Sequence, residues 1–202
     1  MQQRTSQRLE PASITLGILA GGRATRLGGL DKAWLPCHGM PQVLRLLQWS
    51  GRQVGTVVVS ANRNLDRYAT AGLRVAVDRL PDIGPLGGIE ALAATCSTLW
   101  LLTLPVDVVH LDNGLLPRLR AAGPEGAAAQ DHDGLQPLIA LWPVPALRRA
   151  LPDALQARDY SVQSLQRRMD MPTVVFADVR FGNLNTPDDC VAAGMTVGSE
   201  AA

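Results

Sequence analysis

The sequence predicts an α/β fold with a mostly parallel central sheet. Short runs rich in Val, Ile and Leu recur along the chain, and longer segments with helical periodicity separate them. The loops that follow the runs are unusually polar and rich in glycine. Because ligands bind at the carboxyl ends of the strands in open sheets of this kind, these loops are where we expect a functional site.

Composition favours one globular domain. Of the 202 residues, 47% are apolar and 18% are charged, and the formal net charge of +1 gives no general attraction to nucleic acid or to anionic membranes. We expect a flexible leader over residues 1–12, a single domain over 13–194 and a flexible tail over 195–202. Three separated cysteines without a CxxC pair, and the lack of an apolar stretch of about 18 residues, favour a cytoplasmic protein.

Seven short apolar runs are the predicted strands, and each is bounded by turn residues. In chain order they are Ile14 to Ala20, Thr56 to Ser60, Leu73 to Val77, Trp100 to Leu104, Gly126 to Gln130, Leu138 to Trp142 and Thr173 to Phe176. Seven helices are predicted beside them from periodicity and from proline or cap residues at their starts. These are Pro41 to Arg52, Leu65 to Ala71, Gly88 to Ser97, Asp112 to Ala122, Pro145 to Leu155, Ser161 to Met169 and Pro187 to Ala193.

The loop after the first predicted strand reads AGGRATRLGGLDK and has the chemistry of a polyphosphate site. Gly21 and Gly22 let backbone N–H groups approach a phosphate closely, and Arg23, Arg26 and Lys32 add positive charge. The spacing matches neither the P-loop nor GxGxxG, so it supports neither an ATPase nor a dinucleotide-binding site. Three cations interleaved with glycines make a plain flexible connector the weaker interpretation.

Carboxylates follow two further strands. Asp107 comes after Pro105 at the end of the fourth predicted strand, and Asp78 follows the third. A single carboxylate can hold Mg²⁺ on a nucleotide, because phosphates and water supply the other ligands. An aspartate in such a place is also a common turn former, so Asp107 gains weight only from sharing a sheet edge with Lys32.

Amide and glycine residues complete the candidates. The Asn62 amide of VSANRN could read a base or a ribose, although the residue also suits a turn. In GPLGG, Gly87 either makes room for a nucleotide or permits tight packing. In NLNTP, a capping role for Thr186 leaves Asn183 and Asn185 unexplained, so both are candidate contacts to phosphate or metal.

Taken in order, LAGG, Arg26, GGLDK, SANRN, GPLGG, PVD and NLNTP closely resemble the molybdenum cofactor guanylyltransferases of the MobA type, over about Ile14 to Asp189. The first motif belongs to the wider nucleotidyltransferase family. The resemblance implies a Rossmann-like, three-layer α/β fold of the nucleotide-diphospho-sugar transferase type. The segment DHDGLQPLIAL is similar in placement to the strand of that family on the substrate side, without assigning a pterin pocket.

The resemblance also implies roles for residues of this chain. Main-chain atoms of Leu19, Ala20 and Gly21, with Gly22 beside them, would contact GTP. Lys32 and Arg26 would stabilise its phosphates, Asn62 and Asp78 would contact the nucleoside, and Asp107 would bind both nucleotide and magnesium. Asp31 is then expected to shape the loop that presents Lys32.

The implied reaction is transfer of GMP from GTP to the terminal phosphate of molybdopterin or its molybdenum form, with release of pyrophosphate. Transient contact with molybdenum-insertion proteins or apo-molybdoenzymes would follow, without nucleic acid or membrane partners. A cytidylyltransferase or a sugar-phosphate nucleotidyltransferase of the same fold is an alternative. A carrier that binds the pterin without catalysis is a weaker alternative, because it would need neither a triphosphate site nor a metal aspartate.

Overall fold

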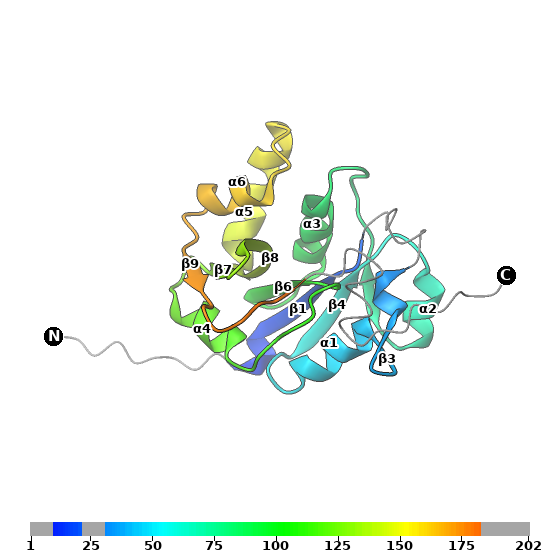
Figure 1. The fold of residues 1–202 in the computed structure, drawn as a ribbon. Coiled ribbons are helices and arrows are strands. Elements are labelled where there is room, and N and C mark those ends of the chain that lie inside the picture. Colours follow the sequence, from blue (N-terminus) through cyan, green and yellow to red (C-terminus); the bar gives the residue numbers. More distant parts are fainter. Residues whose placement is uncertain (1–9, 22–30, 183–202) are drawn as a thin grey trace.

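A twisted sheet of seven strands forms the middle layer of the molecule (Figure 1). The computed structural model describes residues 10–21 and 31–182. The strand order is β5-β4-β1-β6-β8-β7-β9, and β8 alone in this sheet runs antiparallel to both of its neighbours. The strands are β1 (Ile14–Leu19), β4 (Thr56–Ser60), β5 (Arg74–Ala76), β6 (Trp100–Pro105), β7 (Ala127–Asp131), β8 (Gly134–Pro143) and β9 (Thr173–Val175).

Helices cover both faces of the sheet, so the fold has three layers (Figure 1). α1 (Gln42–Ser50), α2 (Leu65–Thr70) and α4 (Leu115–Ala121) contribute to one apolar core, and α3 (Pro85–Thr95), α5 (Val144–Gln156) and α6 (Val162–Arg168) contribute to the other. Every residue of β1 and β6 is buried. Their side chains alternate between the two cores, as central strands of a mostly parallel sheet require.

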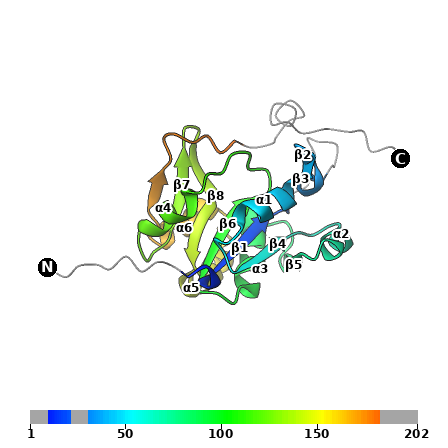
Figure 2. The ribbon, with the colours of Figure 1, turned by 90° about the horizontal axis from the view of Figure 1, so that it is seen from below.

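The predicted fold class is confirmed, and every strand and helix predicted within the described residues is present. The predicted helix Pro187 to Ala193 lies outside them. Three short features lack a periodic signal and were not expected. They are the 3-10 helices η1 (Pro11–Ser13) and η3 (Lys32–Trp34), and the small hairpin of β2 (Pro36–Cys37) and β3 (Met40–Pro41) seen beside α1 in Figure 2. No helix in residues 10–21 and 31–182 has the length and apolarity of a membrane span.

Two elements begin three or more residues earlier than predicted. α3 starts at Pro85 rather than Gly88, because Gly84 supplies a turn with φ of 67° and Pro85 suits the first helical turn. β8 starts at Gly134 rather than Leu138, since residues 132 and 133 close a tight hairpin with β7. Gly134, with φ of 111°, permits that hairpin. The antiparallel β8 follows directly from this short connection.

Candidate active site

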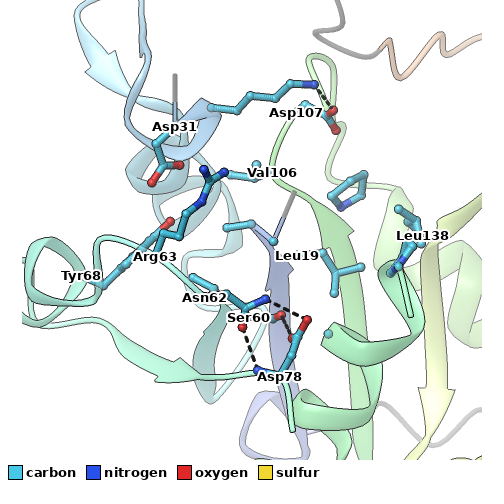
Figure 3. Close-up of a pocket in the computed structure, with 18 of the residues that line it drawn as sticks. Leu19, Asp31, Ser60, Asn62, Arg63, Tyr68, Asp78, Val106, Asp107 and Leu138 are labelled. Carbon is cyan, nitrogen blue, oxygen red and sulfur yellow. Dashed lines mark hydrogen bonds and ion pairs between the residues drawn. The ribbon is translucent and has the colours of Figure 1, made fainter. Parts of the chain in front are cut away.

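A cleft of about 1020 Å³ opens at the carboxyl ends of β1, β4 and β6 (Figure 3). The end of β1 contributes Leu19 to Gly21, and the end of β4 with the loop after it contributes Ser60 to Arg63. Asp78 enters from the loop after β5, and Pro105 to Asp107 from the end of β6. These loops meet because parallel strands bring their carboxyl ends to one edge of the sheet.

The cleft collects the sequence-predicted residues that the structure describes, with the exception of Gly87. Its lining includes Leu19, Ala20, Gly21, Lys32, Asn62, Asp78 and Asp107. Gly87 is buried inside α3 and is not part of this lining. Gly22, Arg26, Asn183 and Asn185 lie outside the described residues. Positions spread over about ninety residues of sequence therefore converge on one surface, while their contacts with a nucleotide stay predictions.

Lys32 and Asp107 form an ion pair at one end of the cleft. The Lys32 Nζ atom lies 2.9 Å from Asp107 Oδ2, and both side chains are 20% exposed. Asp31 does not pair with its neighbour Lys32 in this arrangement. Its Oδ1 accepts a hydrogen bond from the Ala33 N–H at 3.1 Å, and its Oδ2 accepts one from Asn64 at 2.8 Å. Asp31 therefore caps η3 and fixes the turn that presents Lys32.

Asn62 and Asp78 are hydrogen-bonded to each other at the opposite end of the cleft (Figure 3). The Asn62 Nδ2 group donates to Asp78 Oδ2 at 2.9 Å, and the Asp78 main-chain N–H donates to Asn62 Oδ1 at 2.9 Å. Ser60 Oγ donates to the second carboxylate oxygen of Asp78 at 3.3 Å. This network joins the loops after two adjacent strands and leaves both side chains in the cleft wall.

Two glycines allow α3 to lie directly beneath this end of the cleft. A Cβ at Gly88 would lie 2.6 Å from Ser60 Oγ and 2.9 Å from Leu19 Cδ2. A Cβ at Gly87 would lie 3.1 Å from Asp78 Oδ2. Close packing against Asp78 therefore accounts for Gly87 without a nucleotide contact, which is one of the two alternatives that the sequence left open.

Several lining residues were missed by sequence reasoning. Ser60 carried a weak signal, since it is a polar residue that ends a strand directly after three valines. Arg63, Tyr68 and Asp82 carried none, because exposed loop charges and a helical tyrosine are common. Tyr68 is fully buried, and among the described residues its hydroxyl has no hydrogen-bond partner. Burial and the nearby Asp31 carboxylate raise the pKa of Tyr68 well above its usual range, so the hydroxyl keeps its proton.

The charge of the described lining matters for an anionic ligand. The described lining holds two cations, Lys32 and Arg63, and four carboxylates, those of Asp31, Asp78, Asp82 and Asp107. This part of the cleft would repel a polyphosphate unless further positive charge arrived with it. Arg23 and Arg26 belong to the segment outside the described residues.

A metal ion bound to a nucleotide would supply the additional positive charge that a polyphosphate needs in this cleft. No group of three or more His, Cys, Asp or Glu side chains suited to metal binding occurs in residues 10–21 and 31–182. The described residues therefore offer no set of three such ligands for a metal held by protein groups alone. Their chemistry fits Mg²⁺ bound between phosphates and one carboxylate, and Asp107 is the partly exposed carboxylate beside the phosphate-binding candidate Lys32.

A family model and related sequences both match most of this chain. The model of the MobA-like NTP transferase domain matches residues 16–172. A molybdenum cofactor guanylyltransferase of Cupriavidus necator is 37% identical over 187 residues, which cover 87% of this chain and 94% of that protein. One from Polynucleobacter asymbioticus is 36% identical over 190 residues, covering 90% and 96% of the two chains.

Solved structures show the same fold at lower identity. The molybdopterin-guanine dinucleotide biosynthesis protein A of Archaeoglobus fulgidus superimposes with a TM-score of 0.69 at 20% identity, covering 89% of this chain and 96% of that one. The 2-C-methyl-D-erythritol 4-phosphate cytidylyltransferase of Thermus thermophilus gives a TM-score of 0.66 at 14% identity, covering 88% and 96%. At these identities the likeness concerns the fold.

Proposed function

The chain belongs to the molybdenum cofactor guanylyltransferases of the MobA-like NTP transferase family, and we propose that its cleft transfers GMP from GTP to molybdopterin. The assignment of this activity to the cleft rests on one observation. The Lys32–Asp107 pair and the Asn62–Asp78 pair lie at opposite ends of the same cavity. A nucleoside triphosphate needs two different sets of partners in one cavity. Cationic and metal-binding groups contact its phosphates, and polar groups contact its nucleoside.

The reaction is an in-line displacement at the α-phosphorus of GTP. A terminal phosphate oxygen of molybdopterin forms the new P–O bond. The bond from the α-phosphorus to the bridging oxygen breaks, and pyrophosphate leaves with that electron pair. Because the attacking oxygen is already anionic, no general base is required. Catalysis then consists of orienting two anions and stabilising the charge that develops between them.

The chain's own residues divide this work. Lys32, with Arg26, would stabilise the departing pyrophosphate, and main-chain N–H groups near Gly21 would orient the phosphates. Asp107 would hold Mg²⁺, which when bound supplies positive charge to the phosphate oxygens. Asn62 and Asp78 would fix the nucleoside, and Asn183 and Asn185 remain candidates for the phosphate side.

Partners and location are inferred from this chemistry. GTP and molybdopterin, or its molybdenum form, are the substrates, and the dinucleotide product must pass to a recipient apo-molybdoenzyme or insertion protein. The proposed setting is the cytoplasm. A domain spanning residues 13–194 remains the proposed unit, and it contains the whole segment matched by the family model.

The decisive experiment measures pyrophosphate release. The purified protein is incubated with GTP and Mg²⁺, with and without molybdopterin, and then with ATP, CTP and UTP in place of GTP. Release that needs GTP, Mg²⁺ and molybdopterin together supports the proposal. A preference for CTP, or for a sugar-phosphate acceptor, would assign the protein to another nucleotidyltransferase class. Pterin binding without any pyrophosphate release would favour a carrier.

A further inference from the structure

The loop that carries Asp107 is held from behind by α1. The main-chain carbonyl of Val108 accepts two hydrogen bonds, one from Gln42 Nε2 at 2.7 Å and one from Arg45 Nη2 at 2.6 Å. A carbonyl oxygen has two lone pairs, so both of its acceptor positions are filled. The residue that follows Asp107 is thus fixed by side chains more than sixty positions earlier in the chain.

Gln42 and Arg45 also orient each other. Arg45 Nε donates to Gln42 Oε1 at 2.8 Å, which leaves the Gln42 Nε2 group directed at the Val108 carbonyl. Gln42 is fully buried, and burial lowers the pKa of the Arg45 guanidinium. Burial of an amide and part of a guanidinium is costly without hydrogen bonds, so the geometry of this pair is strongly specified.

The same end of α1 is attached to the segment that carries Lys32. The Gln42 main-chain N–H donates to the Leu35 carbonyl at 3.1 Å, one residue beyond η3. One helix start therefore contacts the backbone next to Asp107 and the backbone that follows Lys32. The side chains of these two residues meet 2.9 Å apart.

We propose that Gln42 and Arg45 are positioning residues for the nucleotidyl transfer. By fixing the Val108 carbonyl, they hold Asp107 at the position from which it faces both Lys32 and the incoming metal–triphosphate. Neither side chain lines the cleft, so their effect passes through the backbone at 107–108. This role rests on the proposed function of the cleft.

The test compares Gln42→Leu and Arg45→Leu with a matched control, Arg148→Leu. Arg148 also donates to main-chain carbonyls, those of Ala93 and Cys96, but it does so at the far end of α3, on the opposite face of the sheet. Three quantities are measured: Mn²⁺ affinity by electron paramagnetic resonance with a non-hydrolysable GTP analogue, the Mg²⁺ dependence of pyrophosphate release, and Tm.

Both Leu variants are expected to weaken Mn²⁺ binding and raise the half-saturating Mg²⁺ concentration by about tenfold, as loss of groups that orient metal ligands commonly does. Arg45→Lys, which keeps one donor for the Val108 carbonyl, should recover part of that loss. Arg148→Leu should lower Tm to a similar extent and leave metal binding unchanged. Metal affinity in the Gln42 and Arg45 variants equal to that in Arg148→Leu would overturn the inference.

The outcomes also separate this inference from the proposed function. If the wild-type protein releases no pyrophosphate, the function fails, while the Mn²⁺ comparison still decides whether the pair positions Asp107. Should Gln42→Leu fail to fold, Arg45→Leu at a half-buried site provides the same comparison.

Discussion

Lys32 and Asp107, which are 75 positions apart in the chain, neutralise each other at one end of the cleft with their charged atoms 2.9 Å apart. The pair keeps an ammonium and a carboxylate in a defined place without substrate. A triphosphate with its metal presents each of them with a stronger partner, because the ammonium can then face phosphate oxygens and the carboxylate can face the cation. The ion pair is thus a resting arrangement of two groups that we expect to separate on binding.

Asp107→Ala should nearly abolish pyrophosphate release while the fold is retained. Its carboxylate is the proposed metal ligand, and the Lys32 ammonium that loses its partner is itself 20% exposed and can reach water. Activity with GTP, Mg²⁺ and molybdopterin should be measured beside circular dichroism and Tm. Asp159→Ala is a suitable control, because it removes a partly exposed carboxylate that is paired with Arg168 and does not line the cleft. Near-normal turnover by Asp107→Ala would contradict the assigned role.

Lys32→Ala should lower the rate of pyrophosphate release by about 10² or more, the loss expected for one charged contact to the transition state. Lys32→Arg should retain more activity, because it keeps the charge but changes its geometry. Rate and GTP KM are measured separately by steady-state kinetics. If the alanine variant changed only KM, Lys32 would contribute to binding rather than to stabilisation of the transition state.

Asn62→Ala should raise the GTP KM about tenfold and affect the rate at saturation less. The Asn62 amide fixes Asp78 through two hydrogen bonds, so its loss frees a nucleoside contact while the phosphate end is unchanged. Asn62→Asp should be worse, since it places a second carboxylate against Asp78. Calorimetric titration of GTP gives the affinity directly. Equal affinities in the wild type and both variants would remove this pair from the binding site.

Much of the fold was predictable because central parallel strands are apolar on both faces. β1 and β6 stand out as continuous buried runs, and their positions followed from the sequence within one residue at either end. The direction of β8 was not predictable in the same way. It depends on a two-residue connection at His132 and Asp133, and strand periodicity carries no information about such a turn.

The residues of the candidate site also fall into a group that the sequence could predict and a group that it could not. Residues at strand ends, such as Asp107 and Asn62, could be proposed because the topology itself collects strand ends at one edge. Gln42 and Arg45 could not, because their partner is a main-chain carbonyl that any residue type would supply. Side chain to main chain contacts over long sequence separations become visible only with the fold.

Gly88→Ala should destabilise the protein by about 1–3 kcal/mol, the usual cost of forcing a methyl group into a packed core. Its Cβ would overlap Ser60 Oγ, so α3 or the end of β4 must shift, and GTP binding should weaken with it. Ser60→Ala removes that atom, and the double variant should therefore be more stable than the sum of the single effects predicts. Urea denaturation measures the coupling. Additive effects would mean that Ser60 is not the obstacle.

Asp131→Asn should destabilise the protein by about 2–3 kcal/mol, through its buried network rather than through the cleft. The buried Asp131 carboxylate accepts hydrogen bonds from the Asp133 N–H at 3.0 Å, Gln136 Nε2 at 3.0 Å and the Phe181 N–H at 2.8 Å. Asparagine offers one acceptor oxygen in place of two. The NH₂ group of the asparagine must then face one of these donors. It faces the Phe181 N–H if the remaining oxygen keeps the other two hydrogen bonds.

The effect should extend to the loop that carries Asp107. The Phe181 carbonyl accepts hydrogen bonds from the N–H groups of Val109 and His110, at 3.0 Å and 2.9 Å. When Phe181 loses its hydrogen bond to Asp131, this loop loses a support that is separate from its contacts with α1. Pyrophosphate release should therefore fall more than in Asp159→Asn, whose carboxylate accepts a local hydrogen bond from the Ser161 N–H and does not line the cleft. Hydrogen exchange of the Val109 and His110 amides measures the loosening, and unchanged protection there would show that Phe181 does not depend on Asp131.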